Sequence, residues 1–457
     1  NIIIEVVAVL IISAVILNFT RAKYRVTQSI PLVNGTINYS LADINIVALY
    51  IDGVEADELD STKQYTLDTS QSTCTYKDGS PIDGLSLNYD SNTKTFSITP
   101  YTTKGTKCTL YFNEKQLVKD VIIANSERGT GEPNFGNTSC TNGSNDGGNC
   151  GEETVGLYEE TTSKGTTYYY RGDVEDNYLV FADKYWRIIR INEDGTIRII
   201  YSGEKSEVDA AGKETVLANG YNDGSTDYTQ IAVDDSGTKT SVYNSSYNRS
   251  EYVGYTYVEG EQRPSDSPDT EPTSSTIKRV LDTWYNTNLA SYDSYIDGNA
   301  GFCNDREMAS NNTWESQPSS IIQYAAYERI VSNSTASLEC SNPEDLYTTS
   351  GSKDGNKALT NPIGLITADE VMYAGGIVGI SNCGYYLYTG NYYWTMSPYN
   401  FDGRWRGDAH VFLVHSVGDL GSYGRVNSTG DVRPVINLKA DVTITGGGTI
   451  NNPYTIS

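Results

Sequence analysis

"TTYYYRGDVEDNYLVFADKYWRIIRINEDGTIRIIYSG", residues 166–203, is the stretch that decides the fold. It is dense in β-branched and aromatic residues, which suit the pleated, half-buried surface of a sheet. Asp194 and Gly195 form a dipeptide typical of a tight hairpin turn. The stretch therefore predicts three or four strands, and residues 156–457 as a whole mix strands with a few helices.

The composition of the whole chain supports a mainly β, extracellular protein. The 457 residues include 37 Tyr against 8 Phe and 5 Trp, and tyrosine fits half-buried strands whose hydroxyls stay in water. The 33 Lys and Arg against 58 Asp and Glu give a net charge of -25. Nucleic acid is therefore excluded as an expected partner, because phosphate binding needs a basic face. We interpret the acidity as an aid to solubility.

A divalent-cation site is the alternative interpretation of the acidic loops at 192–196 and 233–238. Neither loop has the ligand spacing of an EF-hand. Only two histidines occur, and no CxxC cluster accompanies them, so a zinc site is not expected. We predict neither a metal nor a cofactor.

Composition shifts divide the chain into four segments. Residues 1–30 are expected to form a hydrophobic helix, and residues 31–124 contain short alternating runs with turn signals, which predict a small β-sandwich. Residues 125–155 are almost free of apolar side chains and predict a linker. Residues 156–457 predict a larger α+β domain.

Two helices are expected in this last segment. The first follows a Ser or Thr N-cap and places four apolar residues on one face, namely Ile277, Val280, Leu281 and Trp284. The second begins at Thr367 and Glu370, which have capping-box spacing, and ends at the glycines 375–376.

Seven cysteines indicate disulfides in an oxidising compartment, with reduced buried thiols as the alternative. Their order along the chain suggests three pairs, Cys74–Cys108, Cys140–Cys150 and Cys303–Cys340. Cys383 is left over, and we interpret it as a buried thiol and not a nucleophile.

The N-terminal run "NIIIEVVAVLIISAVILNF" is apolar or small from residue 2 to 17 except for Glu5 and Ser13. As a helix, 18 such residues span roughly 27 Å, close to a hydrocarbon core. A lone carboxylate in such a segment costs several kcal/mol, so Glu5 should be neutralised or paired.

This run resembles the mature N-terminus of type IV pilins and pseudopilins, in which the fifth residue is glutamate and the hydrophobic segment is retained after cleavage. Asn1 departs from the family, which usually has Phe or Met there. The resemblance implies a filament in which Glu5 pairs with the α-ammonium of Asn1 on a neighbouring subunit. The apolar contacts between subunits would come from Ile2, Ile3, Ile4, Val6, Val9, Leu10, Ile12 and Ile16.

Two alternatives remain for the N-terminal run. It could be an ordinary signal anchor that tolerates a glutamate, or the sequence could lack its first residues. An uncut anchor would start with Met and a basic flank, which this sequence does not show.

A second resemblance covers most of residues 156–457. The segments "YWRIIRINEDGTIRIIY", "ALTNPIGLITADEVMYAGG", "YYLYTGNYYWTMSP" and "DVRPVINLKADVTITGGG" resemble an uncharacterised domain of Firmicutes surface proteins. That domain is similar to the C-type-lectin-like fold of formylglycine-generating enzymes and adhesins. Such an oxidase needs two active cysteines near the C-terminus, where only Cys383 stands, so we do not expect an enzyme.

The best candidate for a ligand surface is "WTMSPYNFDGRWRGDAH", which concentrates Tyr399, Arg404, Trp405 and Arg406. Aromatic and arginine side chains near a glycine-rich loop are typical of glycan or protein interfaces. The alternative is a core around Trp394 with a decorated surface.

Two other motifs carry little weight. His410 and His415, with Asp408 and Ser416, form a triad only on paper, because the alternating strand 409–417 explains them. The tripeptide Arg-Gly-Asp at 171–173 is a three-residue match in a strand-like context.

These observations predict the structural subunit of an extracellular pilus-like filament that is inserted in the cytoplasmic membrane before assembly. The alternative is a membrane-anchored surface adhesin or ligand-binding protein, whose partner would be a host or cell-surface glycan or protein. In both cases the chain would act without chemistry of its own.

Overall fold

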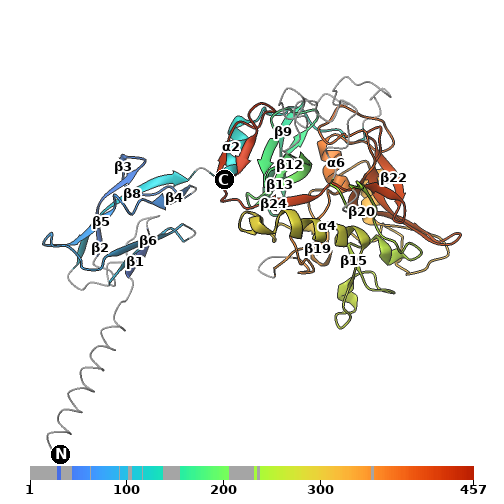
Figure 1. Cartoon of the computed structure of the whole chain (residues 1–457), viewed down its shortest axis with the longest axis horizontal. Coiled ribbons are helices and arrows are strands. Elements are labelled where there is room, and N and C mark those ends of the chain that lie inside the picture. The colour runs from blue at the N-terminus through green and yellow to red at the C-terminus, as the bar shows by residue number, and fades with distance from the viewer. Residues whose placement is uncertain are drawn as a thin grey trace, which may run out of the picture. The chain divides into compact units, whose positions relative to one another are not determined.

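The computed structural model of the chain describes residues 28–31, 44–61, 63–91, 93–100, 105–115, 117–136, 155–204, 231–233, 237–350 and 355–456. The chain divides into two compact units, residues 1–117 and 118–457 (Figure 1). Strand accounts for 37% of the structure and helix for 15%, which confirms a mainly β protein. In the described part of the chain, no helix has the length and apolar character needed to cross a membrane.

Residues 1–27 of the expected N-terminal helix lie outside the described residues. The residues predicted to mediate self-assembly belong to this part. Residues 28–31 form strand β1 (Gln28–Pro31), which pairs antiparallel with β7 (Thr95–Thr99). The prediction that the helix continues to residue 30 is therefore wrong for its last three residues. Pro31 favours an extended backbone at the residue before it.

The described residues of the first unit form two sheets. The larger sheet has the order β3-β2-β8-β4, with β5 paired to β8, and the smaller has the order β1-β7-β6. Their bounds are β2 (Ile44–Ile51), β3 (Val54–Ala56), β4 (Gln64–Leu67), β5 (Thr73–Tyr76), β6 (Ser86–Asp90) and β8 (Thr106–Lys115). Alternate residues of β8 are buried, as expected for a strand with one face on a core. Leu110 and Phe112 from this strand and Phe96 and Ile98 from β7 join one hydrophobic cluster.

The second unit contains an eight-stranded sheet with the order β24-β13-β12-β11-β26-β25, extended by β10 on β12 and β9 on β10. Its strands are β9 (Gly156–Thr162), β10 (Gly165–Arg171), β11 (Tyr178–Phe181), β12 (Lys184–Ile191), β13 (Ile197–Glu204), β24 (Val435–Leu438), β25 (Ile444–Thr445) and β26 (Tyr454–Ile456). The opening stretch of sequence thus supplies β10 to β13, which confirms the predicted strands. Strand β12 is buried at nearly every position because it is central to the sheet.

A second sheet in this unit has the order β14-β23-β20-β21-β22, with β18 paired to β20. These strands are β14 (Thr240–Val242), β18 (Ile321–Gln323), β20 (Tyr393–Asp402), β21 (Asp408–Val414), β22 (Leu420–Arg425) and β23 (Thr429–Asp431). Two short ladders join β15 (Thr256–Tyr257) to β16 (Thr273–Ser274) and β17 (Phe302–Cys303) to β19 (Leu346–Tyr347). Buried residues from both larger sheets share one core, which includes Trp186 and Trp394.

The helices among the described residues are short. They are α2 (Val118–Asn125), α4 (Thr276–Asn288), α5 (Ala325–Tyr327), α6 (Ala368–Ala374), the π-turn η6 (Glu328–Ser332), and the 3₁₀ turns η3 (Ser250–Val253), η4 (Pro264–Asp266), η5 (Ala290–Tyr295) and η7 (Pro343–Asp345). Both predicted helices occur as α4 and α6. Ser275 caps α4 by accepting a hydrogen bond from the Lys278 amide, and Gly375 ends α6 at a φ of 123°.

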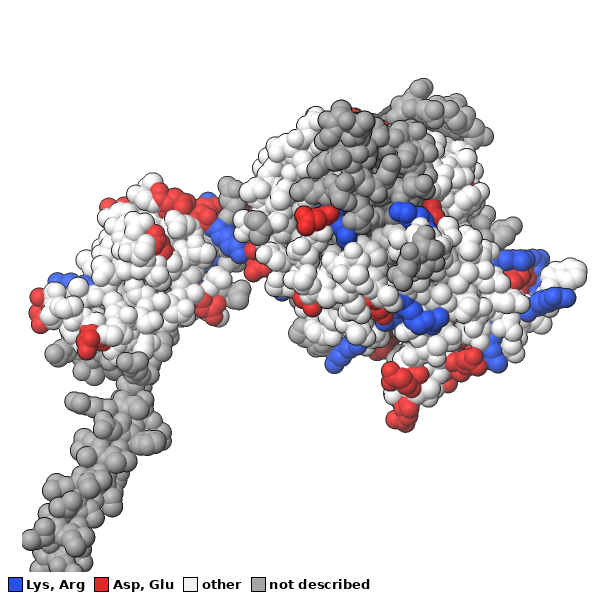
Figure 2. Space-filling model, viewed as in Figure 1, with Lys and Arg blue, Asp and Glu red and all other residues white. Residues whose placement is uncertain are grey.

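Helix α2 belongs to the second unit. Its Val118 and Ile122 are fully buried in the core of that unit, whereas the sequence placed residues up to 124 in the first domain. The boundary between the compact units lies instead at residues 117 and 118. On the face shown in Figure 2, acidic and basic side chains are interspersed among larger neutral areas.

Candidate functional site

A cavity of about 380 Å³ in the second unit is lined mainly by charged and polar side chains. Most of its wall comes from the β12–β13 hairpin, the chain around β17, residues 337–340 and the first turn of α6, and single residues are added by other segments, namely Lys164, Arg329, Leu346 and Ser397. Its volume falls within the range of about 300 to 1,000 Å³ that is usual for small-molecule sites.

The hairpin contributes two arginines. Arg190 of β12 and Arg198 of β13 are direct cross-strand partners, so their side chains leave the sheet on the same face. Like charges in such a position repel and destabilise a hairpin by themselves. A carboxylate between the two guanidinium groups would offset this repulsion.

Glu370 of α6 provides this carboxylate. Its Oε1 lies 2.5 Å from Arg198 Nε and 3.4 Å from Arg190 Nε. The exposed fractions of the three side chains are 4% for Glu370, 3% for Arg198 and 13% for Arg190. Burial lowers the pKa of the Arg198 guanidinium, and the charge of Glu370 opposes that effect. We call these three residues the arginine triad.

The predicted capping box fixes Glu370 in place. The Thr367 amide donates to Glu370 Oε2 over 2.9 Å, and the Glu370 amide donates to Thr367 Oγ1 over 3.1 Å. Glu370 thus completes the capping box of α6 and also pairs with the arginines of the β12–β13 hairpin. These contacts hold together two elements that are far apart in the sequence.

A second charged group stands beside the first. Arg329 of η6 donates to both oxygens of Asp369 over 2.7 and 2.8 Å and to Asp305 Oδ2 over 2.6 Å. Burial raises the pKa of the Asp369 carboxyl, and the hydrogen bonds from Arg329 oppose this shift. We call Asp305, Arg329 and Asp369 the aspartate triad.

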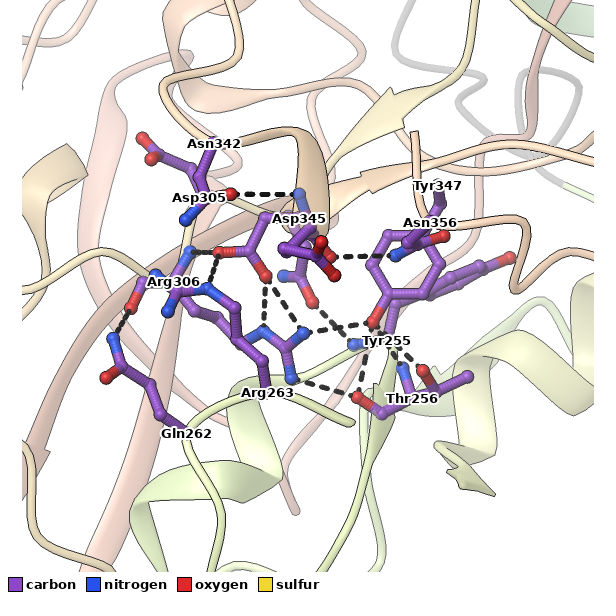
Figure 3. A network of polar contacts seen from close by, with 12 residues as sticks. Tyr255, Thr256, Gln262, Arg263, Asp305, Arg306, Asn342, Asp345, Tyr347 and Asn356 are labelled. Carbon is purple, nitrogen blue, oxygen red and sulfur yellow. Dashed lines mark hydrogen bonds and ion pairs between the residues drawn. The ribbon is translucent and has the colours of Figure 1, made fainter. Parts of the chain in front are cut away.

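A buried network behind the wall holds Asp305 and the chain around Leu346 in position (Figure 3). Arg306 Nη2 lies 2.8 Å from Asp345 Oδ1, and the Arg306 amide donates to Asp345 Oδ2 over 2.8 Å. Arg263 Nε donates to the same carboxylate over 3.0 Å. Arg306 and Asp345 are almost completely buried and are not among the residues that line the cavity, so we assign this network a structural role.

The disulfide Cys303–Cys340 forms part of the cavity wall, and Cys74–Cys108 joins β5 to β8. Both pairs were predicted, whereas Cys140 and Cys150 lie outside the described residues. Cys383 is a free thiol in the described part of the chain and is partly exposed. It is less buried than the sequence suggested.

The predicted ligand surface is divided by the fold. Trp405 is 91% exposed in the β20–β21 turn, and Arg406 is exposed beside it. Arg404 makes a bidentate contact with Asp402 over 2.9 and 2.7 Å. Tyr399, in contrast, is buried and packs edge-on against Tyr327 and Phe412. A ring inside the core cannot join a surface, so Tyr399 is removed from the candidate residues.

The two histidines have separate surroundings. His410 Nδ1 lies 2.8 Å from Asn400 Oδ1, and His415 Nδ1 lies 3.1 Å from Asp419 Oδ1. Asp408 pairs with Arg425 over 3.2 Å. These contacts agree with strand and turn roles for both histidines.

The Arg-Gly-Asp tripeptide does not present its arginine. Arg171 is 2% exposed and donates to the carbonyl oxygens of Met372 and Tyr373. An integrin ligand needs an accessible arginine, so this motif is part of the packing between β10 and α6.

Sequence reasoning missed both triads. The turn at Asp194-Gly195 sets the register of the hairpin, which places residues 190 and 198 opposite one another. The sequence could therefore have predicted a cross-strand pair of arginines. The sequence could not have predicted that Glu370 pairs with these two arginines. No family model, curated protein or solved structure matches this chain.

Proposed function

We propose that the chain is a bacterial surface protein whose second unit binds a small polar molecule in the cavity. The observation that supports this proposal is the presence of two buried charged triads on the wall of a cavity of ligand size. The triads are held by a hairpin, a capped helix and a disulfide, and rigid supports of this kind preorganise binding groups.

The proposed location outside the cytoplasm is supported by two disulfides, since such bonds persist in oxidising compartments. The relation of the second unit to the C-type-lectin-like fold remains a proposal based on the sequence. A glycan or protein partner at Trp405 and Arg406 also remains a prediction.

A variant that fills the cavity tests the binding function. Ala300 lines the cavity, and the variant Ala300→Trp should occupy much of its volume. We expect at least one compound in a library of small polar metabolites to raise the melting temperature of the full chain, and Ala300→Trp to abolish that shift. The matched control is Ala290→Trp, because Ala290 is exposed in η5 and does not line the cavity.

A library that leaves the melting temperature of the full chain unchanged would contradict the binding function. A shift that persists in Ala300→Trp would place the binding elsewhere on the protein.

A second function is favoured by Glu5. We propose, from the sequence alone, that residues 1–25 also allow the chain to assemble as a pilus-like filament, with Glu5 paired to Asn1 of a neighbouring subunit. The cavity would then be displayed along a fibre.

A further inference from the structure

We propose that the cavity selects a small zwitterion, namely a free α-amino acid. Its carboxylate would face the arginine triad and its ammonium group the aspartate triad. This inference rests on the proposed binding function and names the class of ligand.

The net charges of the two triads carry the argument. Two guanidiniums share one carboxylate in the arginine triad, which leaves one positive charge. Two carboxylates share one guanidinium in the aspartate triad, which leaves one negative charge. Asp369 and Glu370 are consecutive residues and both line the cavity, so the two opposite charges stand next to one another.

The two adjacent triads offset one another's charge, and they still present a positive and a negative end to a molecule that enters the cavity. A ligand with one positive and one negative group would neutralise both triads at once. A simple anion or a simple cation would neutralise only one, and a neutral sugar neither. Among the described residues that line the cavity, none is aromatic, so a sugar ring would also lack a stacking surface.

Hydrogen-bonding capacity points the same way. A guanidinium has five N–H groups, and within the described residues Arg190 donates one hydrogen bond, to the Leu338 carbonyl, while its Nε lies 3.4 Å from Glu370 Oε1 in an ion pair. Its other N–H groups are suited to a carboxylate, which arginine binds in bidentate fashion. Each carboxylate of the aspartate triad offers about four acceptor positions. Asp305 accepts from Arg329 and Ser341, which leaves capacity for an ammonium group.

The remaining charged groups on the wall refine the expected side chain. Outside the triads these are Lys164 against Glu193, Asp194 and Glu339. This acidic surplus should repel an acidic side chain. We therefore expect neutral or basic amino acids to bind more tightly than aspartate.

Calorimetry on the full chain tests the proposal by comparing amino acids with compounds that carry only the carboxylate or only the ammonium group. The amino acids are alanine, lysine and aspartate. Propionate lacks the ammonium group of alanine, ethylammonium lacks its carboxylate, and glucose is the neutral comparison. We expect alanine or lysine to bind at least about tenfold more tightly than either half-ligand and than glucose.

Two variants separate the ends of the ligand. Arg190→Gln should weaken amino-acid binding at least about tenfold, and Glu370 keeps Arg198 as its partner. Asp305→Asn should weaken amino-acid binding and leave propionate unaffected. Asparagine tolerates the positive φ of 50° at this position, so the fold should persist. The matched controls are Arg425→Gln and Asp269→Asn, which alter exposed residues outside the cavity.

Four results would overturn the inference. Equal affinity for alanine and propionate would remove the role of the aspartate triad, and full amino-acid affinity in Arg190→Gln would remove that of the arginine triad. Binding of glucose without amino acids, lost in Ala300→Trp, would refute the zwitterion while leaving the binding function intact. A chain that binds no compound of the metabolite library would refute both.

Discussion

His410 shows what burial does to a single ionisable residue. It is 5% exposed in β21, and burial lowers the pKa of its imidazole to about 4. The unfolded chain, with a histidine pKa of about 6.5, therefore binds more protons than the folded chain between these values. The stability contributed by neutral His410 is complete above about pH 6.5 and is lost as the pH falls toward 4.

This linkage predicts a pH effect that one substitution removes. Between about pH 7.5 and 5, the unfolding free energy of the wild type should fall by about 2 kcal/mol more than that of His410→Gln. Denaturant titrations at the two pH values measure the difference, since carboxylate titrations are common to both proteins. His415→Gln keeps His410 and should retain the wild-type fall. An equal fall in wild type and His410→Gln would show that His410 already titrates normally in the folded state.

At the scale of elements, the cavity depends on segments that are clamped together. Strand β17 and residues 337–340 are joined by the disulfide Cys303–Cys340, whose cysteines are 37 residues apart. A crosslink of this span stabilises mainly by restricting the unfolded chain.

We expect the double variant Cys303→Ser, Cys340→Ser to lose about 3 kcal/mol of unfolding free energy. It should also bind the cavity ligand more weakly, because both residues form the wall. Urea denaturation and calorimetry measure the two effects. Cys383→Ser removes a cysteine outside any disulfide and should change neither quantity. Unchanged stability in the double variant under oxidising conditions would mean that the bond does not constrain the unfolded chain.

Local elements were predictable because their causes are local. The hairpin at 194–195 and the capping box of α6 both follow from residues within a few positions of each other. The extent of the N-terminal helix was overestimated, since pairing with β7 recruits residues 28–31 into a strand. A contact with residues 95–98 is invisible to any local pattern.

At the scale of the whole molecule, the two units give the chain separate cores, and residues 1–25 carry the assembly hypothesis. A filament requires the Glu5 carboxylate to find a partner between subunits, because an apolar environment penalises an unpaired charge. Glu5→Ala should therefore impair fibre formation while leaving the thermal unfolding of both units unchanged.

Negative-stain microscopy of the full chain, with melting curves on the same samples, tests this prediction. The control Glu58→Ala changes an exposed carboxylate of the first unit and should assemble normally. A wild-type chain found only as monomers in detergent or lipid, or normal fibres from Glu5→Ala, would contradict the filament hypothesis.

The sequence by itself determined the β-rich class, the strands of residues 166–203, both helices with their caps, and the pairs Cys74–Cys108 and Cys303–Cys340. Each follows from propensity, period or spacing along the chain. Only the tertiary structure decided that Tyr399 and Arg171 are buried and that Glu370 separates two arginines. Charges from distant segments meet through long-range packing, and neither their distances nor their burial is encoded in any local pattern.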